Sequence, residues 1–287
     1  MKISGFSFVR NAIRYDYPFV ESISSILPLC DEFIIAVGDS QDGTLERLRA
    51  INSPKLKIIE TIWNESLRVG GQILAQETNV ALDHVTGDWA FYLQADEVVH
   101  EDDLPNIESA MKQHAEDRRV EGLLFRYRHF YGSYEFVGAS RRWYRNEVRI
   151  VRPGIGVRSW GDAQGFRIDG RKLRVRPLDA AINHYGWVKS PEKQQAKQLS
   201  FNKYWHSDEW VKKNVGSDNA YDYSEGGMLT RFTGRHPAVM MDRVANQNWT
   251  FDYDPATVRV PLKEKLLSLV ESSIGWRVGE YRNYELI

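Results

Sequence analysis

Polar, oxygen-bearing side chains follow an apolar run at residues 89–93. Gln94, Asp96 and Glu97 come directly after this run, which has the length of a short strand. An apolar run bounded by turn residues is typical of a buried strand. Gln94 and Asp96 lie two residues apart, so both side chains point to the same side of an extended chain. Carboxylate and amide oxygens suit a hard divalent cation that carries phosphates, although a solvated acidic loop would have the same residues.

Two residues elsewhere in the chain have types that suit the same kind of site. Asp39 begins the polar part of the turn at 38–44, where a carboxylate can accept hydrogen bonds from a ribose hydroxyl or a base N–H. Its alternative role is that of a turn or helix-cap aspartate beside glycine. His184 lies in the run 180–187 and is either a metal ligand or a core histidine bound to the backbone. The residues themselves leave both choices open.

These side chains need a scaffold that brings strand ends together. Apolar runs predict strands at 3–9, 33–37, 56–60 and 89–93, and apolar residues at helical spacing predict a helix in each interval between them. Such alternation implies βαβ units and a mostly parallel sheet with helices on both faces. Ligands bind at the carboxyl ends of the strands in sheets of this type. Asp39 follows the second strand and Asp96 the fourth, so we expect both at one rim.

The second half of the chain has a different pattern. Alternating apolar and basic residues predict antiparallel strands with one solvated face, at 122–130 and more loosely at 142–152 and 173–175. Ser190 as N-cap and Pro191 in the first turn predict a helix that runs to about Trp205. A further helix is expected at 262–272.

Composition excludes several classes of protein. The formal net charge of the 287 residues is −1, so no global field recruits nucleic acid or an anionic membrane. The single cysteine, Cys30, excludes an intrachain disulfide and lies in an apolar stretch, which favours a core residue over a nucleophile. The sequence shows no signal-peptide pattern and no apolar run of about 18 residues. We therefore expect a cytoplasmic protein.

In their order along the chain, several of these segments resemble the family 2 glycosyltransferases with the GT-A fold. Phe8-Val9-Arg10-Asn11 stands where that family has its first strand and an Asn-Glu turn. Residues 39–44, Asp-Ser-Gln-Asp-Gly-Thr, are similar to the family's Asp-Ser-x-Ser-x-Asp-Gly-Thr turn, whose first Asp touches the nucleotide. Segments 79–82, 87–89 and 94–97 are similar to the helix and strand that deliver its Asp-x-Asp motif. Gln94 replaces the first Asp of that motif, and Thr78 stands where many relatives have Arg.

The resemblance implies a set of binding residues. A divalent cation, Mn²⁺ or Mg²⁺, would be held by Asp96 and His184. Some of Arg141, Arg142 and Arg145 would neutralise phosphate or acceptor charge. The residues expected to bind the nucleoside diphosphate sugar are Arg10, Asn11, Asp39, Gln94, Asp96 and Arg142.

The acceptor hydroxyl in such a reaction must lose a proton as it attacks the anomeric carbon, and a carboxylate near the metal would serve as general base. Asp162 is the preferred candidate, and its alternative role is a turn residue beside Gly161. Glu97 and Glu135 are the other candidates. The Glu-Asp pair that marks the base in many relatives is not visible in this sequence.

The resemblance further implies a GT-A domain at 1–188, with a nucleotide-binding half at 1–117 and an acceptor-side half at 118–188. Residues 189–287 would form a mainly helical extension. The implied activity is metal-dependent, inverting transfer of a sugar from a nucleoside diphosphate to a carbohydrate or lipid-linked acceptor, in polysaccharide or glycolipid synthesis. A lipid-linked acceptor would bring the protein to the inner face of a membrane.

Two other functions remain open. The first is a non-catalytic carbohydrate- or nucleotide-binding protein on the same fold, which the neutral Gln94 keeps open. The second is a sugar-1-phosphate nucleotidyltransferase, which would need a Gly-rich phosphate loop after the first strand. Residues 8–11 offer no such loop.

Overall fold

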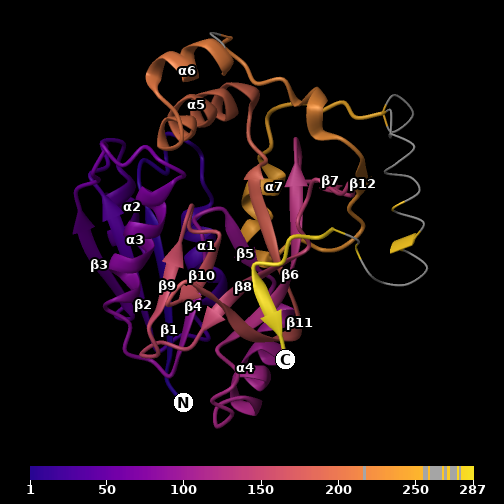
Figure 1. The fold of residues 1–287 in the computed structure, drawn as a ribbon. Coiled ribbons are helices and arrows are strands. Elements are labelled where there is room, and N and C mark those ends of the chain that lie inside the picture. Colours follow the sequence, from indigo (N-terminus) through magenta and orange to yellow (C-terminus); the bar gives the residue numbers. More distant parts are fainter. Residues whose placement is uncertain (216–217, 255–257, 259–266, 268–269, 272–276, 278) are drawn as a thin grey trace.

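A twisted sheet crosses the molecule, and its main path has the strand order β3-β2-β1-β4-β8-β6-β11-β10-β9 (Figure 1). The computed structural model describes residues 1–215, 218–254, 258, 267, 270–271, 277 and 279–287. The strands of the first half pair in parallel, as predicted, because each returns through a helix. They are β1 (Ile3–Val9), β2 (Glu32–Gly38), β3 (Leu56–Thr61) and β4 (Trp89–Tyr92).

The second half of the sheet differs from the antiparallel arrangement that the sequence predicts. β8 (Asn146–Val151) is antiparallel to both β4 and β6 (Gly122–Tyr131), but β6 pairs in parallel with β11 (Arg171–Trp187). The basic residues of β6 do not form one open face either. Arg126 is exposed, whereas Arg128 is half-buried and donates to Asn183 Oδ1 on β11 at 2.6 Å. The alternation in the sequence therefore reflects two kinds of polar position: side chains exposed to solvent, and side chains that form hydrogen bonds within the sheet.

Several strands of three or four residues were not predicted, because none of them lies in an apolar run as long as residues 89–93. β9 (Val157–Trp160) and β10 (Gly165–Ile168) form a hairpin beside β11, and β5 (Glu97–Val99) also pairs with β11. The remaining ones are β7 (Phe136–Gly138), β12 (Leu229–Arg231) and β13 (Tyr284–Leu286).

Helices cover both faces of the sheet, and their apolar sides build two cores. α1 (Phe19–Ile26) and α4 (Leu104–Gln113) contribute to one core, and α3 (Gln72–Leu82) contributes to the other. The predicted fold class, a GT-A-like α/β fold, is thereby confirmed. The other helices and 3₁₀ turns are α2 (Thr44–Arg49), α5 (Pro191–Phe201), α6 (Asp208–Asn214), α7 (Met241–Ala245), η1 (Glu101–Asp103), η2 (Asn202–Tyr204), η3 (Tyr223–Gly226) and η4 (Ala238–Met240).

The segment after residue 188 contains both helices and strands. α5 starts as predicted, with the Ser190 hydroxyl accepting from the Lys193 N–H at 3.4 Å, and it lies with α6 at the top of Figure 1. β12 pairs with β7, and β13 returns to β11. The helix expected at 262–272 falls mostly outside the described residues, and the boundary at 188 stays a prediction. No helix in the described ranges has the length and apolar character needed to cross a membrane.

Candidate active site

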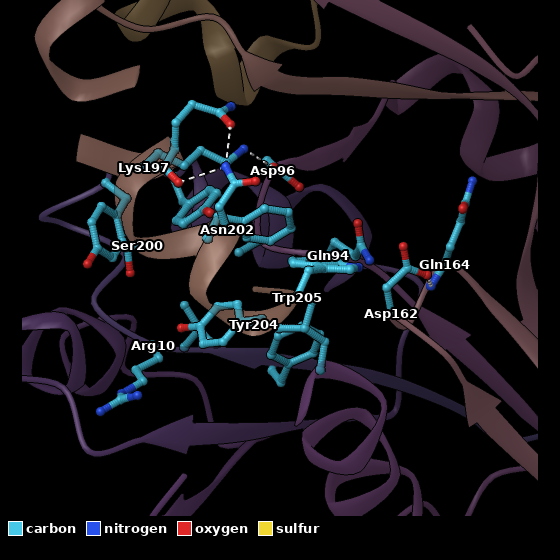
Figure 2. Close-up of a pocket in the computed structure, with 18 of the residues that line it drawn as sticks. Arg10, Gln94, Asp96, Asp162, Gln164, Lys197, Ser200, Asn202, Tyr204 and Trp205 are labelled. Atoms are coloured by element: carbon cyan, nitrogen blue, oxygen red, sulfur yellow. Dashed lines mark hydrogen bonds and ion pairs between the residues drawn. The ribbon is translucent and has the colours of Figure 1, made fainter. Parts of the chain in front are cut away.

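A cavity of about 570 Å³ opens at the carboxyl ends of β1 and β4. Arg10 follows β1, Gln94 and Asp96 follow β4, and His184 projects from β11. The volume lies in the range of small-molecule sites, about 300–1,000 Å³. Figure 2 shows the labelled residues around this space. The cavity lies where the strand-end argument predicts a ligand site.

Asp96 and His184 face each other across a gap that a side chain would block. Asp96 Oδ2 lies 3.7 Å from His184 Nε2, and both residues are more than nine-tenths buried. Gly186 lies beside the gap: a Cβ there would be 2.5 Å from each of these two atoms. One carboxylate oxygen and one imidazole nitrogen, in reach of each other and kept clear by a glycine, fit a divalent cation that takes its remaining ligands from water and phosphate.

His129 sets which nitrogen of His184 carries the proton. Burial lowers the pKa of His129 well below its usual value, so its ring is neutral. Its Nε2 lies 3.1 Å from the Tyr144 carbonyl and donates to it, which leaves Nδ1 as an acceptor. The His184 Nδ1, 3.3 Å away, must then donate. In its neutral form, His184 therefore presents the lone pair of Nε2 toward Asp96, as a metal ligand requires.

The Asp96 carboxylate is held in its charged form. Burial by itself would raise the pKa of Asp96, but the charge of Lys197, together with the adjacent His184, outweighs burial and holds this pKa well below its usual range. Lys197 Nζ lies 3.4 Å from Asp96 Oδ2 (Figure 2). Burial lowers the pKa of Lys197, and the charge of Asp96 opposes that shift. Asp96 is thus available as an anionic ligand at neutral pH.

A strained turn between β9 and β10 brings Asp162 to the cavity. Ala163, the next residue, has a φ of 64°, a conformation that is uncommon for residues other than glycine and often found at functional sites. The Gln94 side-chain amide donates to the Ala163 carbonyl at 3.3 Å. A carboxylate in place of Gln94 has no N–H to donate, which gives a physical reason for the amide at this position. Asn79, on α3, exchanges hydrogen bonds of 2.8 and 3.1 Å with Ser159 and so anchors β9.

Glu97, the neighbour of Asp96, points away from the cavity. It is fully buried and receives two hydrogen bonds of 2.7 Å from Arg149, which is also fully buried. Tyr127 donates to it at 2.5 Å. Both Glu97 oxygens are thus engaged, and Glu97 does not line the cavity. Its carboxylate therefore has no path to the hydroxyl proton of an acceptor substrate. This geometry argues against Glu97 as a general base and for a structural role.

Glu147 lies behind the cavity wall, where its Oε1 accepts from the Gln164 side chain at 2.9 Å. Burial raises the pKa of Glu147 to about 8, although the charge of Arg149 opposes the shift. The folded protein therefore binds a proton here that the unfolded chain releases near its ordinary pKa of 4.5. The stabilisation is complete below that value and is lost as pH rises through 8.

We expect Glu147→Gln to remove this pH dependence, because an amide mimics the protonated carboxyl. The wild-type free energy of unfolding should fall between pH 5 and 8 relative to that of the variant, by at most about 1.4 kcal/mol per pH unit. Urea unfolding of both proteins at each pH measures the difference. Parallel curves would show that Glu147 is charged in the folded state.

The nucleoside end of the predicted site gathers around Arg10. Its Nε lies 3.1 Å from Asp39 Oδ1, its Nη2 lies 2.8 Å from Glu65, and its guanidinium stacks 5.3 Å from the centre of the Trp63 ring. Arg10 and Trp63 line the cavity, whereas Asp39 is exposed beside it. Asn11 has a φ of 51° and its side chain accepts from the Gln41 N–H at 3.0 Å, so it holds the β2–α2 turn.

Other residues singled out in the sequence lie outside this cavity. Arg142 is exposed and donates to the Glu225 carbonyl. Arg141 and Arg145 pair with Glu271 at 2.8 and 2.7 Å and line a separate cavity of about 280 Å³. This placement does not support the predicted contact of these arginines with the donor phosphate, and their alternative role, to neutralise acceptor charge, stays a prediction. The remaining candidate base, Glu135, is exposed and paired with Arg231 at 2.9 Å.

A group of three potential metal ligands and the free thiol both lie away from the cavity. His100, Glu101 and Asp102 form the group within the described residues. Both of its carboxylates are paired with Arg235, at 2.6 and 2.9 Å, and we assign the group no role. Cys30 is a buried free thiol whose pKa burial raises to about 12, which suits the expected core residue.

The segment after residue 190 supplies much of the cavity wall, and sequence reasoning missed this. Lys197, Phe201, Tyr204 and Trp205 all line the cavity, and the Gly71 N–H donates to the Tyr204 carbonyl at 3.1 Å. Lys197 and Phe201 lie four residues apart on one helical face, which is a detectable signal. That spacing does not reveal what the face packs against.

Residues 17–174, more than half of the chain, match the model of glycosyl transferase family 2. No curated protein sequence matches the chain. Among solved structures, S. aureus TarS is similar at 17% identity and a TM-score of 0.43, over 70% of this chain and 39% of TarS. TarS 1–349 in complex with UDP-GlcNAc has 14% identity and a TM-score of 0.42, over 75% of this chain and 70% of that one.

A mannosyltransferase, PcManGT from Pyrobaculum calidifontis, in complex with GDP-Man and Mn²⁺, has 23% identity and a TM-score of 0.33, over 42% of this chain and 34% of that one. TM-scores this low carry no argument about the donor or the metal of this chain. The family match is independent of them, and it runs from α1 to the start of β11, so that it includes β4 and Asp96. The chain belongs to glycosyl transferase family 2.

Proposed function

We propose that this protein transfers a sugar from a nucleoside diphosphate donor to an acceptor hydroxyl, with a divalent cation and with inversion at the anomeric carbon. The observation that supports this most directly is the Asp96–His184 gap, kept open by Gly186 and continuous with a cavity that Arg10 also lines. A cation site and a nucleoside site in one cavity match what a diphosphate-linked sugar requires.

Asp96 Oδ2 and His184 Nε2 would hold the cation, Mn²⁺ or Mg²⁺. A cation bound there would supply electrostatic stabilisation to the diphosphate as negative charge develops on it. Arg10, with Asp39 and the Trp63 ring beside it, would contact the nucleoside. The donor diphosphate would lie between these two groups.

Asp162 is the proposed general base. In a single in-line displacement, the acceptor oxygen bonds to the anomeric carbon as the bond from that carbon to the phosphate oxygen breaks, and the acceptor proton passes to the Asp162 carboxylate. Gln94 and the strained turn at Ala163 fix this carboxylate relative to Asp96. The acceptor is proposed to be a carbohydrate or a lipid-linked sugar of polysaccharide or glycolipid synthesis, and the latter would bring the protein to a membrane surface.

Isothermal titration of UDP and GDP, with and without Mn²⁺, tests the binding part of this proposal. We expect one nucleotide to bind only when Mn²⁺ is present. Failure of both to bind under either condition would refute the donor site. Release of free sugar from a panel of nucleotide-sugars then separates an enzyme from a non-catalytic binding protein, which releases none above background.

Gly186→Ala provides a local test of the cation site. Gly186 does not use a left-handed backbone conformation, so alanine brings no backbone strain, but its methyl group would lie 2.5 Å from both proposed ligand atoms. We expect Mn²⁺-dependent nucleotide binding to weaken by about 10- to 100-fold. Thermal unfolding without metal serves as the control for folding. Wild-type affinity in a folded variant would contradict the assignment of Asp96 and His184 as ligands.

A further inference from the structure

The Lys197 side chain is buried in the cavity wall and held by specific contacts, rather than exposed to solvent. Its side chain is 9% exposed, and its Nζ donates to the Gly186 carbonyl at 2.9 Å. Its Nζ also lies 4.9 Å from the centre of the Tyr17 ring and slightly farther from two other aromatic rings. A buried ammonium destabilises a protein unless it is paired, and here Asp96 is the partner.

The Asp96 oxygen that pairs with Lys197 is the same oxygen that faces His184. Both contacts involve Oδ2, at 3.4 Å from Lys197 Nζ and 3.7 Å from His184 Nε2. A divalent cation that bound this oxygen by itself would lie close to the ammonium. Like charges at such separations repel strongly where water is excluded. The chain's own cation therefore opposes binding of a lone metal ion.

Lys197 also has hydrogen-bonding capacity left over. An ammonium has three N–H donors. Asp96 and Gly186 engage two of them, and no other hydrogen-bond acceptor of Nζ occurs among the described residues. Because Lys197 lines the cavity, its third donor suits an anionic oxygen of a ligand there. A diphosphate brings both the acceptor oxygens and the negative charge that would offset the ammonium and a metal ion together.

We propose, resting on the proposed function, that Lys197 binds the donor diphosphate directly and makes divalent-cation binding depend on that diphosphate. In the absence of donor the ammonium neutralises Asp96. When cation and diphosphate enter together, Asp96 turns to the cation and Lys197 to a phosphate oxygen. Metal and donor then bind as a unit, and the cavity does not retain metal without donor.

The test compares Mn²⁺ binding, followed by electron paramagnetic resonance of free Mn²⁺, with nucleotide binding by calorimetry. Wild type should bind Mn²⁺ at least about tenfold more tightly with UDP or GDP present than without. Lys197→Met should bind Mn²⁺ alone at least about tenfold more tightly than wild type does. Its preference for UDP over UMP, or GDP over GMP, with Mn²⁺ should fall by a similar factor. If Lys197 served only as a structural ion-pair partner of Asp96, the variant would keep the wild-type preference for the diphosphate.

Lys193→Met is the matched control, since Lys193 lies on the same helix but is exposed. Lys197→Gln is the second variant, because its amide can still donate to Gly186, and circular dichroism checks the folding of each. Equal Mn²⁺ affinity of wild type with and without diphosphate, or unchanged diphosphate preference in a folded Lys197 variant, overturns the inference. If wild type binds neither UDP nor GDP with Mn²⁺, the proposed function fails and this inference fails with it.

Discussion

Replacing Asp96 with asparagine is expected to abolish Mn²⁺-dependent nucleotide binding and to lower kcat/KM for the transferase or donor hydrolysis by about 10³-fold. Asparagine keeps the size of the side chain and its hydrogen-bonding oxygen, but it removes the only charge that Asp96 offers to a cation. The neighbouring carboxylate of Glu97 cannot replace it, because Arg149 and Tyr127 engage it inside the protein. Calorimetry and single-turnover rates with and without Mn²⁺ measure the two losses.

Asp102→Asn is the control for this experiment. It makes the same chemical change on a carboxylate that is 70% exposed and lies outside the cavity, so activity should remain within about twofold of wild type. Asp96→Asn leaves Lys197 without its partner, so its thermal unfolding must be compared with wild type before the rates are interpreted. A folded Asp96→Asn variant with wild-type metal dependence would refute the cation site.

The second large effect concerns stability. Arg149→Met should lower the free energy of unfolding by about 3–5 kcal/mol, because it leaves the Glu97 carboxylate buried without a counter-charge. Both members of this pair are fully buried, and Nη2 and Oε1 lie 2.7 Å apart. Urea unfolding measures the loss. The double variant Glu97→Gln/Arg149→Met should lose less than the sum of the two single variants, since no charge then remains buried.

Arg49→Met is the control, because it breaks an ion pair of the same length at the surface. Arg49 and Glu60 pair at 2.7 Å, and more than half of each side chain is exposed. Its effect should stay below about 1 kcal/mol. Equal losses in Arg149→Met and Arg49→Met would contradict the structural role of the buried pair. The same variants test Glu97 as a base: at a temperature where Glu97→Gln is folded, its kcat should remain within a few-fold of wild type.

Local patterns in the sequence were sufficient for the first half of the fold. Apolar runs predicted β1 to β4, and apolar residues at helical spacing predicted the helices between them, because both patterns lie within each element itself. Parallel order then placed the residues after β2 and β4 at one edge without further information. In the structure, Arg10 lines the cavity together with Asp96 and also pairs with Asp39. Arg10 therefore connects the carboxyl end of β2 with that of β4.

The second half resisted prediction for a different reason. β6 and β11 are parallel neighbours although about 40 residues and four other strands lie between them in the chain, and nothing local in either strand encodes that pairing. The hairpin that carries Asp162 consists of two four-residue strands, Val-Arg-Ser-Trp and Gly-Phe-Arg-Ile, and neither of them is a continuous apolar run. Its position depends on the hydrogen bonds of Asn79 and Gln94, which join segments far apart in sequence.

The sequence by itself determined the alternation of strands and helices, and with it that Asp96 follows a buried strand at the ligand-binding edge of the sheet. Only the tertiary structure decided that Asp96 opens into the cavity while adjacent Glu97 turns inward to Arg149. It also decided that Lys197, 101 residues further along, pairs with Asp96. Spacing along a helix or strand fixes which side chains share a face, whereas the partner of that face depends on how the whole chain packs.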